Sequence, residues 1–155
     1  MVRDSVYAGD NNAYYRLHVG DAPRPTAVYP AGGRPGESVK VTYLGDTSGP
    51  IESTAKLPDE AVGKHPVFAT QGERIAPSPN WVRVTEHDNV LEAEPNNDRK
   101  TATKASGEMP LAFNGVIDGD EDWFSFTGKK GQTVEVNMYA RGLRTPLDPV
   151  VYLYQ

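Results

Sequence analysis

The sequence predicts an all-β protein, and two observations support this fold class. First, the 155 residues include 15 glycines and 13 prolines, a combined share well above the average of about 12%. Turn residues at this density favour short strands over long helices. Second, runs of alternating apolar and polar residues recur between them, and a period of two is typical of a strand with one buried face.

The expected strands lie between turn signals. The run "SVKVTYLG" follows a loop whose glycines permit positive φ and whose prolines fix φ, and its alternation places Val39, Val41 and Tyr43 on one face. In "NWVRVTEH", Val82 and Val84 share one side, and Trp81 and Arg83 share the other. The other expected strands are "AYYRLHV" (13–19), "AFNGVI" (112–117), "DWFSFT" (122–127), "QTVEVNMYA" (132–140), with Val134, Val136 and Met138 facing inward, and "DPVVYLYQ" (148–155).

Charge divides the chain into two units. Between Glu86 and Asp122 ten acidic residues stand against three basic ones, a local charge of −7 within a chain of net charge −5. We therefore place a boundary near "VTEHDNVLEAEPNND". An acidic middle without a basic stripe makes nucleic acid an unsuitable partner and suits a divalent cation. No apolar run approaches the roughly 18 residues of a membrane span.

Two acidic loops are the candidate site. Glu92 and Glu94 are two residues apart, so their carboxylates share a side of an extended segment, and Pro95 then turns the chain. This turn brings the amide oxygens of Asn96 and Asn97 near those carboxylates. In "DGDEDW", Asp120 and Asp122 also share a side. Such an all-oxygen set is what Ca²⁺ prefers, with 6–8 ligands at about 2.3–2.6 Å. The alternatives are solvated loops without an ion and a carboxylate active site.

Other metal and catalytic motifs fail. The chain has no cysteine, and its three histidines (His18, His65 and His87) are scattered singly, which excludes an ordinary zinc site. "DGDEDW" has Trp123 where an EF-hand loop needs glycine. No nucleophile elbow, zincin motif or P-loop is present. Paired carboxylates also serve glycoside hydrolysis, so a carboxylate-based hydrolase stays as an alternative.

With these motifs in view, the second half resembles the bacterial pre-peptidase C-terminal domain, a family similar to the collagen-binding modules of secreted collagenases. The matching segments, from Leu91 to Gln155, are "EAEPNND", "GVIDGDEDWFSFTGKKGQTVEVNMYA" and "TPLDPVVYLYQ". The resemblance implies a β-sandwich or jelly roll, of which this copy would be a truncated, amino-terminal part. It also implies Ca²⁺ as the cofactor, with Asn97 at a position where the family often has aspartate. The implied ligands are Glu92, Glu94, Asn96, Asn97 and Asp122, together with Asp120.

The first half resembles a different family. "PRPTAVYPAGGRPGESVKVTYLGD" is similar to the opening of an immunoglobulin-like TIG/IPT domain, over roughly Ala22 to Val84. "YAGDNNAYYRLHVG" is similar to the closing strand of a preceding pre-peptidase domain. The expected organisation is therefore a closing strand in 1–20, an immunoglobulin-like module in 21–88, and the amino-terminal part of a pre-peptidase-like sandwich in 89–155. We also expect the last strand either to pair with "AYYRLHV" or to associate between chains.

The aromatic residues have two expected roles. We expect most of them in cores: Trp81, Tyr14 and Tyr15 in the amino-terminal half, and Trp123, Phe124 and Phe126 in the second unit. Tyr152 and Tyr154 are two apart and share a face of a strand. With Tyr139, they form a candidate ligand surface of the kind that binds protein or polysaccharide.

These observations predict a non-catalytic accessory or spacer module of a larger secreted or cell-surface bacterial protein, stabilised by calcium. Its partners would be the neighbouring domains of that protein, and its location would be outside the cytoplasm. The first alternative is a binding module for an extracellular polymer, either a protein such as collagen or a polysaccharide. The second alternative is a carboxylate-based hydrolase.

Overall fold

The computed structural model describes all 155 residues, and it confirms the predicted all-β class. Its regular structure consists of short strands and one 3-10 turn, η1 (Arg141–Leu143). The strands are β1 (Ala27–Tyr29), β2 (Gly32–Gly33), β3 (Ser38–Leu44), β4 (Ile51–Lys56), β5 (Gly63–Val67), β6 (Thr70–Gln71), β7 (Arg74–Ile75), β8 (Asn80–Val84), β9 (Asp88–Leu91), β10 (Thr103–Lys104), β11 (Leu111–Asn114) and β12 (Phe124–Ser125).

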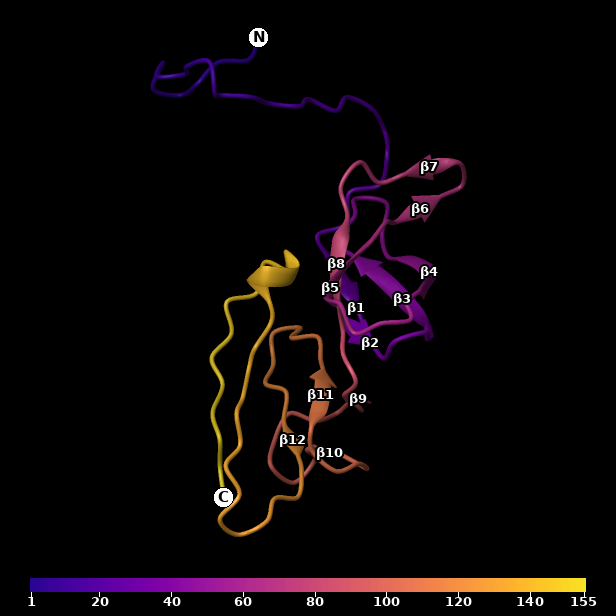
Figure 1. Cartoon of the computed structure of the whole chain (residues 1–155), viewed down its shortest axis with the longest axis vertical. Helices are drawn as coiled ribbons and strands as arrows, with labels where there is room; N and C mark the ends of the chain where they lie inside the picture. Colours follow the sequence, from indigo (N-terminus) through magenta and orange to yellow (C-terminus); the bar gives the residue numbers. More distant parts are fainter.

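Residues 21–84 form the first unit, which contains two three-stranded sheets (Figure 1). One sheet is antiparallel in the order β1-β3-β4, with Val41 opposite Ser53. The other has the order β2-β8-β5, in which β2 runs parallel to β8 and β5 runs antiparallel to it. Buried side chains from both sheets form one hydrophobic cluster, so the two sheets share a core.

The alternation in β3 and β8 positions this core. Val41 and Tyr43 of β3 are 3% and 2% exposed, as the period of two predicts. Val82 and Val84 of β8 are buried, whereas Trp81 and Arg83 on the other side are partly exposed. The cluster consists of Val28, Val41, Tyr43, Ile51, Ala55, Leu57, Val67, Ala69, Ala76, Val82 and Val84.

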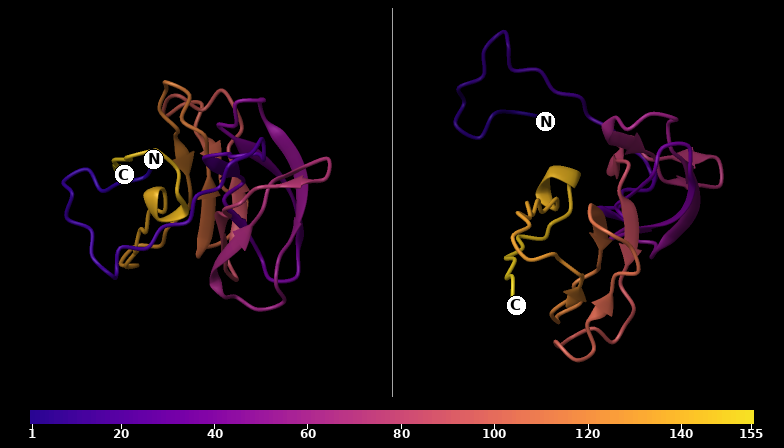
Figure 2. Two further views of the ribbon diagram at one scale, coloured as in Figure 1. Left: turned by 90° about the horizontal axis from the view of Figure 1, so that it is seen from above. Right: turned by 60° about the horizontal axis from the view of Figure 1, so that its bottom comes forward.

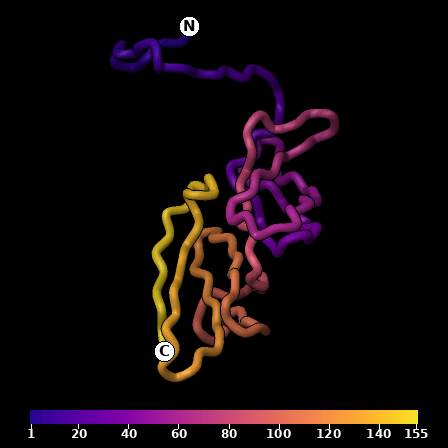
Figure 3. Tube along the Cα trace, viewed as in Figure 1, coloured from indigo at the N-terminus to yellow at the C-terminus, as the bar shows by residue number.

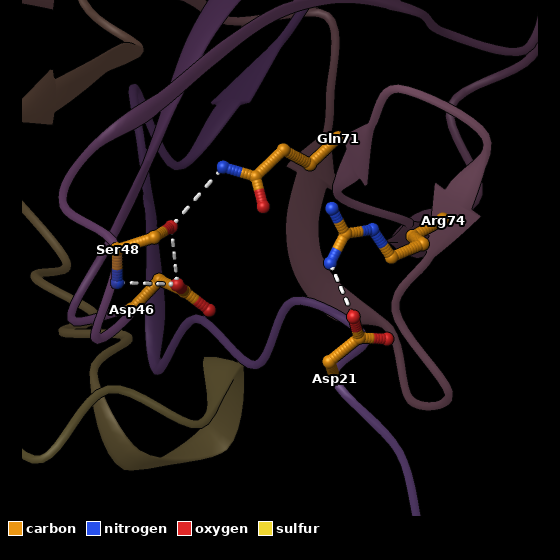
Figure 4. A network of polar contacts seen from close by, with 5 residues as sticks. All are labelled: Asp21, Asp46, Ser48, Gln71 and Arg74. Carbon is orange, nitrogen blue, oxygen red and sulfur yellow. Dashed lines mark hydrogen bonds and ion pairs between the residues drawn. The ribbon is translucent and has the colours of Figure 1, made fainter.

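A surface network holds the small β6–β7 hairpin against the rest of the first unit (Figure 4). Gln71 Nε2 donates to Ser48 Oγ at 3.2 Å, and Ser48 Oγ donates to Asp46 Oδ1 at 2.7 Å. Arg74 pairs with Asp21 at 2.6 Å. Since both members of this ion pair are largely exposed, the network orients the hairpin and adds little stability.

Residues 88–125 form the second unit, which is built differently. Two parallel pairs, β9 with β11 and β10 with β12, contain two to four residues per strand. The residues buried here are Asn96, Thr103 and Asn114, all polar, and none belongs to the hydrophobic cluster. The apolar contacts of this unit are partly exposed: the Phe113 ring lies 5.0 Å from that of Phe124 and 6.1 Å from that of Phe126.

Several expected strands at the two ends are wrong. Residues 13–19 form no strand; Tyr14, Leu17 and Val19 are 89%, 65% and 89% exposed, and this arm extends away from the body (Figures 1 and 2). The expected pairing of 13–19 with the last strand is therefore not formed. No other segment forms a ladder with these residues, and alternation alone cannot satisfy the backbone groups of a strand.

The carboxyl-terminal arm, residues 127–155, also differs from expectation. It runs out and back as two extended lengths joined at η1 (Figures 2 and 3), and neither 132–140 nor 148–155 is a strand. Val134, Val136 and Met138, expected to face inward, are 36%, 55% and 56% exposed. Other expected core aromatics are not buried either: Tyr15 is exposed, and Trp81, Trp123, Phe124 and Phe126 are partly exposed.

Candidate metal centre

The site begins in the loop that follows β9. Glu92 comes directly after β9, and its backbone N–H donates to the carbonyl of Asn114 at 2.9 Å. Glu94 lies two residues further on, and its Oε2 accepts from the backbone N–H of Asn96 at 3.0 Å. The N–H of Ala93, between them, donates to Thr103 Oγ1 at 2.9 Å. These bonds connect the acidic loop to Thr103 and Asn114.

The second acidic loop lies against the first. The backbone N–H of Trp123 donates to the carbonyl of Asn96 at 2.9 Å, which places Asp122 beside the glutamates. Glu92, Glu94 and Asp122 each present one carboxylate oxygen, and these oxygens all lie within 4.8 Å of one another. We call these three residues the carboxylate cluster.

Two buried oxygens in these loops accept no hydrogen bond. They are Oδ1 of Asn96, a residue that is 0% exposed, and Oδ1 of Asp122. The Asn96 side chain is tethered at its other end, since Nδ2 donates to Thr103 Oγ1 at 3.4 Å. A buried acceptor without a hydrogen-bond partner lowers the stability of the folded state by about 1–3 kcal/mol. A cation or a water molecule bound to each oxygen would remove this cost.

The electrostatics of the cluster favour a bound cation. Burial is the main cause that raises the pKa of Glu92, and the charges of Asp122 and Glu94 raise it further, against a lowering contribution from the N–H of Val116. Burial also raises the pKa of Asp122, followed by the charges of Asp120 and Glu94. Both carboxyls thus lie in surroundings that disfavour their ionised forms, and a cation would reverse this.

The backbone of Gly115 lies close to the carboxylates of Glu92 and Asp122. A Cβ at this position would collide with Asp122 Oδ2 and would lie 2.9 Å from Glu92 Oε2. The next residue, Val116, donates its N–H to Glu92 Oε2 at 2.9 Å. Only glycine therefore lets the backbone approach this closely. No role was predicted for Gly115, although an isolated glycine after a strand pattern is a signal of close backbone approach.

The other predicted ligands lie beside the cluster. Asn97 directs its amide nitrogen to Asp120 Oδ2 at 3.4 Å. Asp120 also accepts from the N–H of Asp118 at 2.9 Å, and its charge acts on Asp122. Asn97 and Asp120 are therefore not members of the carboxylate cluster, which consists of Glu92, Glu94 and Asp122. The structure thus brings together three of the six predicted ligands, with a fourth, Asn96, buried in the same loop.

The donor set matches a hard cation. All the candidate ligand atoms are carboxylate or amide oxygens, and Ca²⁺ and Mg²⁺ prefer such oxygens. No histidine belongs to the cluster, so the set lacks the nitrogen and sulfur ligands that zinc sites use. Where calcium is bound, Glu92, Glu94 and Asp122 are the residues that would hold it, and the unpartnered amide oxygen of Asn96 lies in the same loop.

The predicted tyrosine surface is only partly assembled. The Tyr154 ring stacks on Trp123, with centroids 5.2 Å apart and an angle of 18°, and lies 6.4 Å from Tyr152. Tyr139 lies elsewhere, with the guanidinium of Arg83 4.2 Å above its ring. The structure therefore groups Trp123 with Tyr152 and Tyr154, and it separates Tyr139 from this group.

Comparisons with known proteins add no further identification. No protein-family model matches the chain, and searches of curated proteins and of solved structures find no similar protein. The structure contains no helix with the length and apolar character needed to cross a membrane. The function is therefore inferred from the geometry of the carboxylate cluster and its surroundings.

Proposed function

We propose that this chain is a non-catalytic, calcium-stabilised β module that serves as an accessory or spacer in a larger protein outside the cytoplasm. One observation supports the calcium site above all: three carboxylate oxygens converge within 4.8 Å in loops that also bury two oxygens without hydrogen-bond partners. A cation would offset the mutual repulsion and give the unpartnered oxygens a ligand.

The composition of the site points to modest affinity. It offers three carboxylates, of which Glu94 is exposed and the other two are partly exposed. Affinity for calcium rises with ligand charge and site rigidity, and extracellular modules bind at about 10⁻⁴–10⁻³ M. We expect a dissociation constant on the order of 10⁻⁴ M, which fits a structural site in a calcium-rich exterior.

The geometry fits a hydrolase less well. An inverting glycosidase keeps its two carboxyl groups about 6.5–9.5 Å apart to leave room for a water molecule, whereas one carboxylate oxygen from each of the three residues here lies within 4.8 Å of the others. Two surface hollows lie away from them, one between β4 and β5 and one between residues 17–24 and the β7 region. The close grouping favours coordination over acid–base chemistry.

Thermal unfolding tests this proposal. The unfolding midpoint of the whole chain should rise when chelator is replaced by millimolar calcium, because a ligand that binds only the folded state stabilises it. Glu94→Gln keeps the size of the side chain and should greatly reduce the rise. A midpoint that calcium leaves unmoved would show that the acidic loops are merely solvated. An equal rise in Glu94→Gln would place the calcium elsewhere.

A second candidate function rests on the exposed aromatic residues. Tyr152 and Tyr154 are 73% and 61% exposed, and Tyr154 stacks on Trp123. Contiguous aromatic rings can bind a protein chain or the apolar faces of sugars. Binding of the chain to immobilised collagen and to insoluble polysaccharides tests this role. Tyr152→Ala should abolish binding, and Tyr139→Ala, outside the group, should leave it intact.

A further inference from the structure

The carboxylate cluster adjoins the contact between the first and second units. The hydrophobic cluster does not extend across it, since every residue of that cluster lies between Val28 and Val84. An exposed ion pair, Arg34 with Asp88 at 2.7 Å, contributes to it and is worth little. Units that meet without a large apolar interface are expected to move relative to each other.

One buried side chain bridges the two units. Asn114, at the end of β11, accepts at Oδ1 from the backbone N–H of Ala31 in the first unit at 3.0 Å. Its Nδ2 donates to Asn89 Oδ1 at 3.2 Å, and Asn89 Nδ2 in turn donates to the carbonyl of Gly32 at 2.8 Å. Asn114 is 7% exposed, so this bridge is shielded from water.

The same stretch of backbone also holds the cluster. The carbonyl of Asn114 accepts from the N–H of Glu92, Gly115 lies against the carboxylates of Glu92 and Asp122, and the N–H of Val116 donates to Glu92 Oε2. Residues 114–116 therefore contact the first unit on one side and the carboxylates on the other.

We infer that a calcium ion bound by Glu92, Glu94 and Asp122 fixes the orientation of the first unit relative to the second through Asn114. This inference rests on the proposed calcium site. Without the ion, mutual repulsion of the carboxylates loosens Glu92 and, with it, residues 114–116. With the ion, Glu92 is held in place, and the bridge to Ala31 is held with it. Calcium thus converts a hinge into a rigid joint.

Spin labels can test this joint directly, because the chain contains no cysteine. The pair Glu52→Cys and Lys104→Cys places labels on exposed positions of β4 and β10, one in each unit. The control pair, Glu52→Cys and Glu73→Cys, lies wholly in the first unit. Calcium should narrow the distance distribution of the first pair to a single population and leave the control pair unchanged.

The outcomes separate this inference from the proposed function. If calcium raises the unfolding midpoint but leaves the distribution of distances between the labels at positions 52 and 104 broad, the rigid joint is refuted and the calcium site stands. If calcium changes neither quantity, both are refuted. In Asn114→Ala the midpoint should still rise and the narrowing should be lost. Asn114→Leu, which is close to asparagine in size and also removes the acceptor for the Ala31 N–H, replaces it if that variant does not fold. Narrowing that survives the loss of the bridge would overturn the assigned route.

Discussion

Replacing Asp122 by asparagine should have opposite effects on stability with and without calcium. Asp122 lies within 4.8 Å of ligand oxygens on both Glu92 and Glu94. Two unit charges at this separation repel by about 1 kcal/mol in water and by about 3.5 kcal/mol at an effective dielectric constant of about 20. Since these groups are partly or fully exposed, the lower value applies, and Asp122→Asn removes two such repulsions while keeping the shape of the side chain.

The expected magnitudes follow from this geometry. In chelator, Asp122→Asn should be more stable than the wild type by about 1–2 kcal/mol, or about 2–8 °C in a chain of this length. The new amide can also donate to Glu92, which Asp122 already contacts. At a hundredfold excess over the dissociation constant, calcium should stabilise the wild type by about 2.7 kcal/mol and leave the variant nearly unchanged. The order of stability should therefore reverse in calcium.

Differential scanning calorimetry in chelator and in millimolar calcium measures both effects. The matched control is Asp118→Asn, which removes one exposed charge from the same loop but lies outside the cluster. This control should behave as the wild type does. If Asp122→Asn is less stable than the wild type in chelator, repulsion between the carboxylates does not govern the stability of these loops. If its midpoint still rises in calcium, the ion binds elsewhere.

Three further predictions concern pH, backbone approach and the core. The pKa values of Glu92 and Asp122 are raised in the folded state, so the folded chain keeps protons at pH values where the unfolded chain has released them. In chelator, the free energy of unfolding measured by urea titration should therefore fall as pH rises from about 4 through these pKa values. In calcium, this decrease should disappear. Gly115→Ala should displace the two carboxylates and abolish the calcium-dependent shift, with little change of midpoint in chelator; an unaltered shift would show that the close backbone approach is not needed. Leu57→Ala, in the core, should lose about 2–5 kcal/mol in urea unfolding, whereas Leu153→Ala, 66% exposed, should stay within about 0.5 kcal/mol.

The strands that the sequence predicts with their buried faces are those that meet the shared core. Val41 and Tyr43 of β3 and Val82 and Val84 of β8 all lie in the hydrophobic cluster, although β8 pairs with β2 from far earlier in the chain. Residues 13–19 and 132–140 have equally clear alternation but form no strand. Alternation reports which face of a strand could be buried; it does not report whether another segment lies near enough to pair.

The same limit applies to the site. The acidic loops were predicted from their oxygen-bearing residues, since carboxylates two apart share a side of an extended chain. The burial of Asn96 and the approach of Gly115 to Glu92 and Asp122 depend on segments far apart in the chain. No spacing within one segment could indicate them.

The difference in core between the two units gives a physical reason for a cation at the carboxylate cluster. The first unit has eleven buried apolar residues around one core, which is enough to define its sheets. The second unit has strands of two to four residues and buries Asn96, Thr103 and Asn114, so hydrophobic burial contributes little to it. Small units of this kind commonly depend on a metal or another cross-link for stability. A calcium ion held between the loop after β9 and the turn before β12 would add a cross-link to segments whose apolar contacts are the partly exposed rings of Phe113, Phe124 and Phe126, and through Asn114 it would join them to the first unit as well.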